Sequence, residues 1–424
     1  MKSIRKAAII GGVRIPFVKS FKEYSRVSNQ EMLTATVQAT VQKYKLQGKL
    51  LGDVALGVIL NYTSDWNISR EVVMGTDLDP RTPAFNVQRA CGTSLETINL
   101  IALKIAAGQI ESGIAGGSDT NSDLPVMGKR ELAWKLVDIS NAKSFGDRLG
   151  KFLRLRVGDL RPIIPGIREP RTGRTMGEHT ELMVKEWNIS REAQDNLAFQ
   201  SHINAAKAYK EGFYEDLLCE FKGVKRDTIV RGDTSLEKLA KLKPAFDKSE
   251  KGSLTAGNST IFTDGAASIL LTSEEFASKN NLPIQAYFVD AEAAAVDHVH
   301  GAGLLMAPTV AVGRLLQRNN LRLQDFDFYE IHEAFAGQVL CTLKAWESDD
   351  YCRKELGLEN ALGVIDRNKM NVKGGSVALG HPFGATGTRV VSNMSKILER
   401  HGKGRGLVSV CTAGGMGVAA IIER

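Results

Sequence analysis

Cysteine is scarce in this sequence of 424 residues, and its five cysteines lie far apart along the chain. No two of them form a C-x-x-C pair. An odd number of separated cysteines argues against a disulfide framework and against a structural zinc site. We therefore expect a reducing compartment and a cytoplasmic location. The five residues are Cys91, Cys219, Cys341, Cys352 and Cys411.

Long apolar runs are absent as well. Residues 7–13 contain only apolar side chains and glycine, but Arg14 ends this run before it reaches the length of a signal-peptide core, so we predict a strand there. No stretch is long and apolar enough for a membrane-spanning helix. The turn Gly11-Gly12-Val13-Arg14 also lacks the G-x-G-x-x-G spacing that a dinucleotide-binding site requires.

The composition is that of an ordinary globular protein, with 43% hydrophobic and 24% charged residues, and the length suggests two or three folded units. The net charge is +7. Residues 129–174 alone contain 12 Lys or Arg against 5 Asp or Glu, an excess equal to that of the whole chain. Such a segment attracts phosphate-bearing ligands, anionic lipid headgroups or nucleic acid, and a solvated basic face without a ligand explains the charge equally well.

Apolar periodicity predicts strands that alternate with helices, which is typical of a layered α/β sheet. The order of loop, small residues, helix, strand and glycine-rich turn occurs in the first part of the chain and again in the last part, so we predict an internal duplication. The predicted strands are residues 4–10, 54–60, 112–118, 264–271, 326–331, 407–410 and 418–422. The predicted helices include residues 29–41, 95–108, 190–209, 308–317 and 388–398, with a further helix opening at residue 332.

Between residues 124 and 254 the sequence becomes basic and is interrupted by proline, which indicates an inserted subdomain. Within it, residues 151–157 and 163–165 alternate basic and apolar side chains. This pattern suits either a segment on a membrane surface or one whose apolar side packs on the body of the protein. We favour packing, with the basic side chains attracting phosphates.

The segment Gln88-Arg89-Ala90-Cys91-Gly92-Thr93-Ser94 is the centre of the predicted site. An extended approach precedes it and a helical pattern follows, so Cys91 lies where a strand turns into a helix. The partial positive charge of a helix N-terminus favours the thiolate form of a cysteine there. A buried structural cysteine is the alternative, because free cysteine is commonly buried.

Three further reactive side chains, His332, His381 and Cys411, lie at predicted strand ends or helix starts near glycine-rich turns. Ligand crevices in layered α/β folds form at the carboxyl ends of strands, so we expect these groups to converge with Cys91. A thiol nucleophile needs a base, for which His381 is suitable, and it needs oxyanion donors, which glycine-rich turns supply as backbone N–H groups. A second thiol suggests a second proton transfer, at the carbon beside the attacked carbonyl. Taken singly, His332 and Cys411 also fit structural roles.

These residues belong to motifs that occur in the same order in thiolases, and the sequence resembles that family along nearly its whole length. The resemblance implies a five-layered αβαβα fold built from two similar α/β halves with an inserted loop domain. The implied domains are residues 1–124, completed by 255–282, then the inserted domain 125–254 and the second half 283–424. The motifs are Arg89-Ala90-Cys91-Gly92-Thr93-Ser94, Ser190-Arg191-Glu192-Ala193-Gln194-Asp195, Thr255-Ala-Gly-Asn258, Asp264-Gly265-Ala266, His332-Glu-Ala-Phe335, residues 374–387 and residues 411–417.

The resemblance also implies roles for the reactive residues. Cys91 would accept the acyl group, and His381 would activate it and help to hold the thioester oxygen. Cys411 would act as the acid or base at the substrate α-carbon. The backbone N–H groups of Cys91 and Ala413 would form one oxyanion hole, and His332 would share the other with His381.

Coenzyme A enters as a substrate in this family, which uses no metal or redox cofactor. Thr260 lies where a serine often contacts coenzyme A. Three further residues, Met176, Ala334 and Phe335, match positions that line the pantetheine channel.

Three departures from the common thiolase pattern bear on the substrate. His332 stands where many thiolases have asparagine, which resembles the thiolase β-subunits of fatty acid oxidation complexes. Ala413 replaces a usual glycine, and Thr175 occupies a place where short-chain biosynthetic thiolases tend to have histidine. Together they favour thiolysis in fatty acid β-oxidation over a purely acetoacetyl-CoA activity.

The expected activity is therefore a ping-pong acyl transfer in which 3-ketoacyl-CoA acylates Cys91, acetyl-CoA leaves and a second coenzyme A removes the shortened acyl chain. The alternatives are an acetyl-CoA C-acetyltransferase that makes or cleaves acetoacetyl-CoA, and a membrane-docking or assembly subunit of an oxidation complex. A decarboxylating condensing enzyme is disfavoured, because such enzymes usually have histidine or asparagine in the place of Cys411. Expected partners are a second copy in a homodimer or homotetramer, a hydratase/dehydrogenase α-subunit and a membrane surface touched by residues 151–167, but not nucleic acid.

Overall fold

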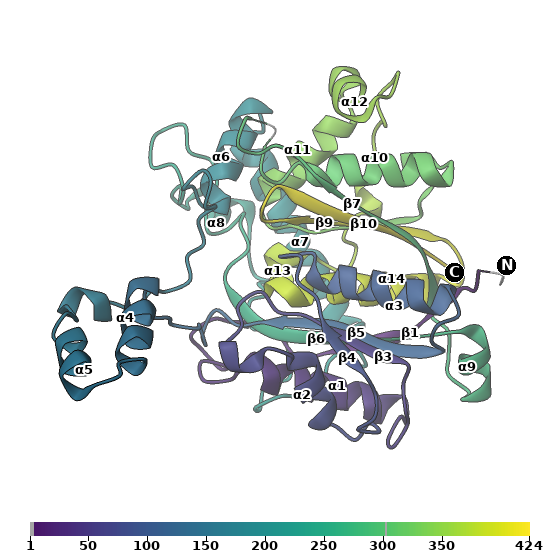
Figure 1. Cartoon of the computed structure of the whole chain (residues 1–424). Helices are drawn as coiled ribbons and strands as arrows, with labels where there is room; N and C mark the ends of the chain where they lie inside the picture. Colours follow the sequence, from purple (N-terminus) through teal and green to yellow (C-terminus); the bar gives the residue numbers. More distant parts are fainter. Residues whose placement is uncertain (1–3, 302) are drawn as a thin grey trace.

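The computed structural model describes residues 4–301 and 303–424. Helices and strands form five layers, in the order helix, sheet, helix, sheet, helix, as predicted (Figure 1). In Figure 1 the lower sheet lies between α1 and α2 on one side and α3 and α14 on the other, and the upper sheet lies between α14 and α10. The fold therefore encloses one helical layer between two sheets.

The two sheets are one hydrogen-bonded path of strands in the order β4-β3-β5-β6-β1-β7-β10-β9-β8. Strand β3 pairs in parallel with β4 and β5, and β6 pairs antiparallel with β5 and β1. The pairing of β1 with β7 joins the halves. The strands are β1 (Ala7–Arg14), β2 (Val18–Lys19), β3 (Asp53–Leu56), β4 (Ala84–Asn86), β5 (Ser112–Asp119), β6 (Thr263–Thr272), β7 (Ala286–Ala295), β8 (Phe328–Ile331), β9 (Arg405–Thr412) and β10 (Met416–Glu423).

The helices divide by layer. The lower outer layer holds α1 (Asn29–Lys43) and α2 (Ile68–Met74), and the central layer holds α3 (Thr93–Ala106), α13 (Ser376–Leu379) and α14 (Thr386–His401). The upper layer holds α10 (Ala307–Asn319), α11 (Ala336–Trp346) and α12 (Asp349–Leu356), and α9 (Glu274–Lys279) follows β6. The inserted region contains α4 (Arg130–Ser140), α5 (Phe145–Phe152), η2 (Val157–Leu160), α6 (Met176–Glu186), α7 (Arg191–Lys210) and α8 (Leu236–Ala240). The remaining 3-10 turns are η1 (Thr63–Asp65), η3 (Leu323–Asp325), η4 (Arg367–Lys369) and η5 (Phe383–Ala385).

The central helices α3 and α14 meet at their N-terminal ends. A Cβ added at Gly387 would lie 2.2 Å from the backbone nitrogen of Leu95, so only glycine permits this approach. The backbone N–H of Thr388 donates to Ser94 Oγ at 2.8 Å. This contact brings the helix that follows Cys91 beside the helix that follows the predicted histidine loop.

Most predicted elements are present, with four corrections. Strand β1 covers Ala7–Arg14, so the turn predicted at residues 11–14 is part of the strand. The strand predicted over residues 54–60 ends at Leu56. The helix predicted to open at residue 332 begins at Ala336, because Phe335 is extended, with φ −143° and ψ 141°. Strand β7 was not predicted, since its sequence Ala-Tyr-Phe-Val-Asp-Ala-Glu-Ala-Ala-Ala lacks a clear alternation and is held by pairing with β1 and β10.

The basic part of the inserted region does not pack on the body of the protein, which corrects the preferred prediction. Helices α4 and α5 stand apart from the layered core (Figure 1), and no residue of either helix is buried. Apolar side chains there remain exposed, including Leu153 and Val157. The division into residues 1–124 with 255–282, 125–254 and 283–424 stays a prediction. None of the helices formed by residues 4–301 and 303–424 has the length and apolar character needed to cross a bilayer.

Candidate active site

Cys91 lies on a tight turn between β4 and α3, as predicted. The backbone of Ala90 is in the left-handed region at φ 44°, which is strained for a residue with a side chain. The turn is closed by the N–H of Gly92, which donates to Arg89 O at 3.0 Å, and by the N–H of Thr93, which donates to Ala90 O at 3.0 Å. The strain at Ala90 was not predictable from the sequence, and it places Cys91 at the apex of the turn.

The prediction that the helix N-terminus favours a thiolate is wrong for the resting protein. Part of Cys91 stays solvent-accessible, but most of the surrounding volume is protein, and this burial raises the pKa of the Cys91 thiol to about 12. A hydrogen bond from the backbone N–H of Ala413 lowers this pKa, whereas the carboxylates of Asp119 and Glu169 raise it further. Loss of hydration therefore outweighs the backbone N–H groups of Ala413 and Cys91, and Cys91 rests as a thiol that needs a base.

Cys411 lies beside Cys91, on β9 just before the turn to β10. Burial raises the pKa of the Cys411 thiol well above its usual value, and the neighbouring Cys91 raises it further. A Cβ added at Gly92 would lie 3.0 Å from Thr412 Cγ2, so the two cysteine segments touch. The structure thus brings together two sulfurs that are far apart in the sequence.

The turn after Cys411 is held by a residue that the sequence analysis missed. Gly414 and Gly415 have φ values of 76° and 70°, which favour glycine. The N–H of Gly414 donates to Glu169 Oε1 at 2.8 Å. Glu169 is buried and belongs to the inserted region, so that region helps to shape the turn that carries Ala413.

The two predicted histidines face each other. The ring centroids of His332 and His381 are 4.1 Å apart, and both residues are buried. Burial, with a contribution from the Arg389 cation, lowers the pKa of His381 to about 3. Burial lowers the pKa of His332 well below its usual value, and His381 and Arg389 lower it further. Both imidazoles are therefore neutral near pH 7, which leaves His381 free to accept a proton.

Hydrogen bonds fix the His381 loop in place. The N–H of His381 bonds Thr263 Oγ1 at 2.8 Å, and His381 Nδ1 lies 2.6 Å from Thr386 Oγ1. Asp119 accepts the N–H of Gly384 at 2.7 Å, which ties the glycine-rich loop to the end of β5. Burial raises the pKa of Asp119 to about 7. The sequence analysis did not single out Asp119, because a single carboxylate at the end of a strand is not a distinctive signal.

His332 is held from behind by two buried residues, Ser376 and Arg389, that the sequence analysis also missed. His332 Nδ1 lies 2.7 Å from Ser376 Oγ, and Arg389 Nη2 donates to the same oxygen at 2.7 Å. The other ring nitrogen of His332, Nε2, is buried and has no hydrogen-bond partner among residues 4–301 and 303–424. An unpartnered buried nitrogen at this place is available to a bound ligand.

The predicted channel residues lie in the neighbourhood of Cys411. Met176, Ala334 and Phe335 pack in the same hydrophobic cluster as Cys411. The Thr260 N–H donates to Ala334 O at 3.0 Å, and its hydroxyl donates to Ser376 O at 3.1 Å. Thr260 therefore links this cluster to the loop that carries Ser376.

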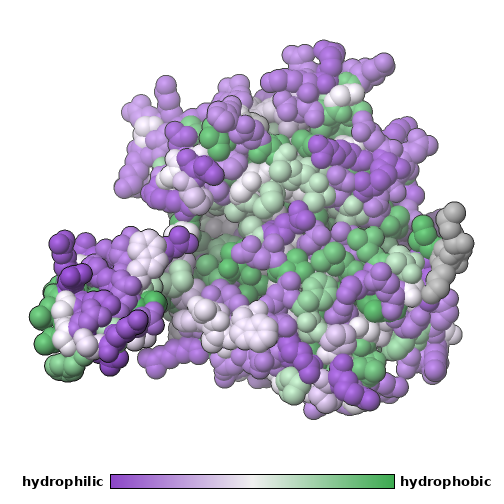
Figure 2. Space-filling view, viewed as in Figure 1, coloured by the Kyte–Doolittle hydropathy of each residue, from purple (hydrophilic) through white to green (hydrophobic). Residues whose placement is uncertain are grey.

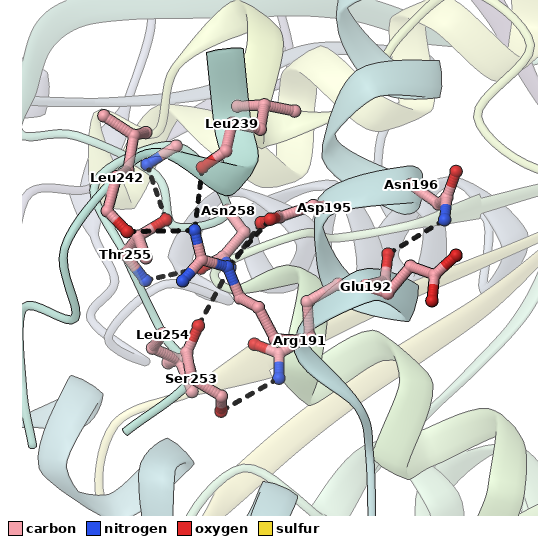
Figure 3. A network of polar contacts seen from close by, with 12 residues as sticks. Arg191, Glu192, Asp195, Asn196, Leu239, Leu242, Ser253, Leu254, Thr255 and Asn258 are labelled. Atoms are coloured by element: carbon pink, nitrogen blue, oxygen red, sulfur yellow. Dashed lines mark hydrogen bonds and ion pairs between the residues drawn. The ribbon is translucent and has the colours of Figure 1, made fainter. Parts of the chain in front are cut away.

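Figure 3 shows that two further sequence motifs hold each other in a polar network. Arg191 Nε donates to Asp195 Oδ2 at 2.8 Å, and its Nη2 donates to two carbonyl oxygens at the end of α8 at 2.7 and 3.1 Å. Asn258 Nδ2 donates to Asp195 Oδ1 at 2.9 Å, and Asn258 O accepts the N–H of Ala336 at 2.9 Å. The network thus anchors the segment that leads from His332 into α11.

Cys91, Cys411, His332, His381 and the N–H of Ala413 form one candidate site. This arrangement offers a nucleophilic thiol, a neutral base, a second thiol and N–H donors for a developing oxyanion. In the part of the chain that the structure describes, no group of three or more His, Cys, Asp or Glu side chains is placed to hold a metal ion.

Comparison with known proteins gives concordant matches. The model of the thiolase N-terminal domain matches residues 7–275, and that of the thiolase C-terminal domain matches residues 282–424. The chain is 40% identical to proteins named 3-ketoacyl-CoA thiolase from Shewanella sp. (strain ANA-3) and Shewanella baltica (strain OS155 / ATCC BAA-1091), over 99% of this chain and 97% of each relative. Among solved structures, the Bacillus anthracis acetyl-CoA acetyltransferase is similar, with a TM-score of 0.82, 30% identity and full coverage of both chains.

Proposed function

This chain belongs to the thiolase family, and we propose from that premise that it is an acyltransferase that cleaves 3-ketoacyl-CoA with coenzyme A in fatty acid β-oxidation. The products are acetyl-CoA and a shortened acyl-CoA. Relatives named 3-ketoacyl-CoA thiolase, 40% identical over 99% of this chain, support this reaction. The observation that carries the proposal is that Cys411 neighbours both Cys91 and the backbone of Ala334, two residues after His332, whose ring faces that of His381 at 4.1 Å.

In the first half-reaction, the sulfur of Cys91 attacks the 3-keto carbon while His381 accepts the thiol proton. The bond between this carbon and the α-carbon then breaks, and the leaving acetyl-CoA carbanion takes a proton from Cys411. The neutral His381 and the buried Cys411 thiol have the protonation states that these transfers require. The products of this half-reaction are acetyl-CoA and an acyl thioester on Cys91.

In the second half-reaction, the Cys411 thiolate takes the proton of an incoming coenzyme A, whose sulfur attacks the acyl carbon on Cys91. Cys91 leaves as a thiolate and recovers its proton from His381. The N–H groups of Cys91 and Ala413 hold the oxyanion on the acyl carbon, and His332 Nε2 with His381 holds the thioester oxygen of acetyl-CoA. Each donor removed from such a hole costs roughly 100- to 1,000-fold in rate.

Coenzyme A is a substrate in this scheme, and no metal or redox cofactor takes part. Thr260 would contact coenzyme A, and Met176, Ala334 and Phe335 would line the path of its pantetheine arm. Their packing around Cys411 supports this placement. We place the enzyme in the cytoplasm, since Cys91, Cys219, Cys341, Cys352 and Cys411 are all free thiols.

Cys91→Ala tests the acyl-transfer scheme. We expect thiolysis of a 3-ketoacyl-CoA to fall by at least about 1,000-fold, because the covalent intermediate cannot form. Thiolysis is followed by loss of absorbance of the 3-ketoacyl-CoA, and intact-protein mass spectrometry of the wild type should show an acyl adduct on Cys91. The control is Cys219→Ala, which alters a half-buried thiol outside the site. Full activity after iodoacetamide has alkylated Cys91 would contradict the scheme.

A second candidate is an acetyl-CoA C-acetyltransferase that makes or cleaves acetoacetyl-CoA, the activity named for the similar Bacillus anthracis structure. A series of 3-ketoacyl-CoA substrates of increasing length separates the two. Higher kcat/KM for longer chains supports β-oxidation, and activity confined to acetoacetyl-CoA supports the alternative.

Assembly is also part of the proposal. We propose a homodimer or homotetramer, with association with a hydratase/dehydrogenase α-subunit as a further step. Strand β4 ends the order of the sheet and leaves an edge that a second copy could extend. Light scattering during size-exclusion chromatography gives the mass, and a monomeric mass at micromolar concentration would refute the homo-oligomer.

A further inference from the structure

Arg389 is a buried cation close to the two histidines of the candidate site. Figure 2 shows hydrophilic side chains over much of the outer surface of the layered core, which is the usual place for charged groups. Arg389 lies on α14 and departs from this distribution, because only 1% of the residue is exposed. A buried guanidinium is costly unless its neighbours use its charge and its N–H donors. Its contacts therefore indicate what this side chain does.

Two buried residues lie within reach of Arg389. Its Nη1 is 3.8 Å from Glu330 Oε2, which is too far for a hydrogen bond, and its Nη2 donates to Ser376 Oγ at 2.7 Å. The Nε and Nη1 atoms of Arg389 have no hydrogen-bond partner among residues 4–301 and 303–424. Within these residues, Ser376 is thus the hydrogen-bond acceptor that holds the guanidinium.

The two contacts of the Ser376 hydroxyl determine the direction of each hydrogen bond. A guanidinium can only donate, so Ser376 Oγ is the acceptor toward Arg389 Nη2. A serine hydroxyl carries one proton, which then needs an acceptor of its own. His332 Nδ1 lies 2.7 Å from Ser376 Oγ, and the described part of the chain offers this hydroxyl no other acceptor. The serine proton is therefore donated to Nδ1.

The opposite tautomer of His332 would leave a buried proton without a partner. If Nδ1 carried the proton, it and Arg389 Nη2 would both donate to Ser376 Oγ, and the serine proton would have no acceptor. An unpaired buried donor of this kind is unfavourable. The doubly protonated ring has the same fault. Burial also lowers the pKa of His332 well below its usual value, and His381 and Arg389 lower it further.

The consequence falls on the other side of the His332 ring. With Nδ1 accepting, a neutral His332 carries its proton on Nε2. This nitrogen is buried and has no hydrogen-bond partner in the part of the chain that the structure describes. The ring faces that of His381 at a centroid distance of 4.1 Å. His332 thus has an unused N–H donor on a ring that lies against the proposed base.

The geometry points to Ser376 and Arg389 as positioning residues that set the tautomer of His332 and make it an Nε2–H donor to the carbonyl oxygen of the acyl-CoA. This inference rests on the proposed function. A preorganised donor stabilises a carbonyl oxygen that gains negative charge, whereas the lone pair of an unprotonated nitrogen repels it. The wrong tautomer would therefore turn a stabilising group into a destabilising one.

Nitrogen-15 NMR of protein labelled at its seven histidines reads the tautomer directly, and the signal that is missing from His332→Asn identifies His332. The wild type should show His332 protonated on Nε2. Ser376→Ala should show a mixture or the other tautomer, because no hydroxyl donates to Nδ1. Ser376→Thr keeps a hydroxyl and should restore the wild-type pattern.

Arg389→Gln tests the contribution of the cation separately. A glutamine side chain can accept as well as donate, so the serine proton could turn toward it and leave Ser376 Oγ to accept from Nδ1–H. We expect a mixture of the two His332 tautomers in this variant. If Arg389→Gln does not fold, Ser376→Ala and Ser376→Thr still decide the question.

Thiolysis provides a second readout. We expect kcat to fall about 10- to 100-fold in Ser376→Ala with little change in KM, because the lost interaction belongs to the transition state. Ser376→Thr should recover most of the loss. The control is Ser395→Ala, which removes another buried serine hydroxyl, bonded to Gln285 Oε1 at 3.0 Å, and should change neither the tautomer nor kcat.

The outcomes separate this inference from the function on which it rests. A wild-type His332 protonated on Nδ1 would overturn it, as would Ser376→Ala with an unchanged tautomer or an unchanged kcat. A folded Arg389→Gln with the wild-type tautomer would overturn the part assigned to Arg389. An inactive wild type with the expected tautomer would instead count against the proposed function alone.

Discussion

Glu333 directly follows His332, yet its surroundings show that it supports the site without reacting. Its carboxylate is buried and accepts hydrogen bonds from Ser201 Oγ at 2.7 Å, Asn371 Nδ2 at 2.6 Å and the N–H of Val377 at 3.2 Å. These three donors come from different segments. Glu333 therefore joins α7, the loop after η4 and the short helix α13 behind the two histidines.

Glu333→Ala should lower the free energy of unfolding by about 3 kcal/mol or more, because three buried donors lose their acceptor. Urea denaturation followed by circular dichroism measures this loss. The control is Glu237→Ala, at an exposed glutamate in the first turn of α8, which should change stability little. Equal effects of the two substitutions would show that the Glu333 hydrogen bonds add no net stability.

His381 makes stability depend on pH in a defined direction. Burial lowers its pKa in the folded protein to about 3, so between this value and its ordinary pKa of about 6.5 only the unfolded chain binds the proton. Stability contributed by the neutral His381 is full above pH 6.5 and is lost as pH falls toward 3, by up to about 1.4 kcal/mol per pH unit.

The comparison of wild type with His381→Asn isolates this contribution from other titrating groups. Urea denaturation at several pH values from 7.5 to 4.5 should show a steeper acid loss of stability in the wild type than in the variant. His401→Asn, at an exposed histidine, is the control and should follow the wild type. Parallel curves for wild type and His381→Asn would mean that His381 is already protonated in the folded protein.

At the scale of elements, the site depends on how closely α3 and α14 approach. One helix begins just after Cys91 and the other just after the His381 loop, and their first turns are joined by the hydrogen bond from Thr388 N–H to Ser94 Oγ at 2.8 Å. Gly387 permits this approach because it has no Cβ. Helix packing in the central layer thus sets the separation of the nucleophile and its base.

Gly387→Ala tests this dependence. The added Cβ would lie 2.2 Å from the backbone nitrogen of Leu95, so the helices must move apart, and we expect a loss of about 1 to 3 kcal/mol in stability together with reduced kcat. Thermal unfolding and steady-state thiolysis measure the two effects. Gly146→Ala is the control, since a Cβ there meets no atom within 4 Å. Wild-type stability and activity in Gly387→Ala would show that the helix approach is not tight.

At the scale of the whole molecule, the candidate active site and the protrusion of residues 126–167 occupy separate parts of the fold. Cys91 precedes α3, His381 follows α13 and Cys411 lies near the end of β9, whereas α4 and α5 of the protrusion lie outside the layers (Figure 1). The protrusion is closed at its base by two backbone bonds, from Met127 N to Ile163 O at 3.0 Å and from Ile163 N to Met127 O at 2.7 Å. The unit is therefore removable without cutting the core.

Replacement of residues 128–162 by a short Gly-Ser turn should preserve both the melting temperature and thiolysis. The reason is that α4 and α5 contribute no buried residue to the core. Differential scanning fluorimetry and the thiolysis assay provide the two measurements. Loss of thiolysis in a folded deletion variant would show that the protrusion also serves the active site.

Periodicity and motif order in the sequence were sufficient to predict the layered α/β class, most strands and helices, and the family. The sequence also predicted Cys91, Cys411, His332 and His381 as site residues, because reactive side chains beside glycine-rich turns stand out locally. Strand β7 escaped prediction, since its alanine-rich sequence is a strand only through its pairing with β1 and β10.

The protonation states and the supporting residues were decided only by tertiary structure. The sequence placed Cys91 at a helix start and so favoured a thiolate, but the pKa depends on hydration, which is set by what the rest of the chain packs around the sulfur. Arg389, Asp119 and Glu169 act through contacts with residues distant in the sequence, so no local pattern marks them. Ser376 lies in the motif of residues 374–387, but its contact with His332 is not visible in that motif. Local sequence determined which groups are reactive and which elements carry them, and long-range packing determined their neighbours and therefore their chemistry.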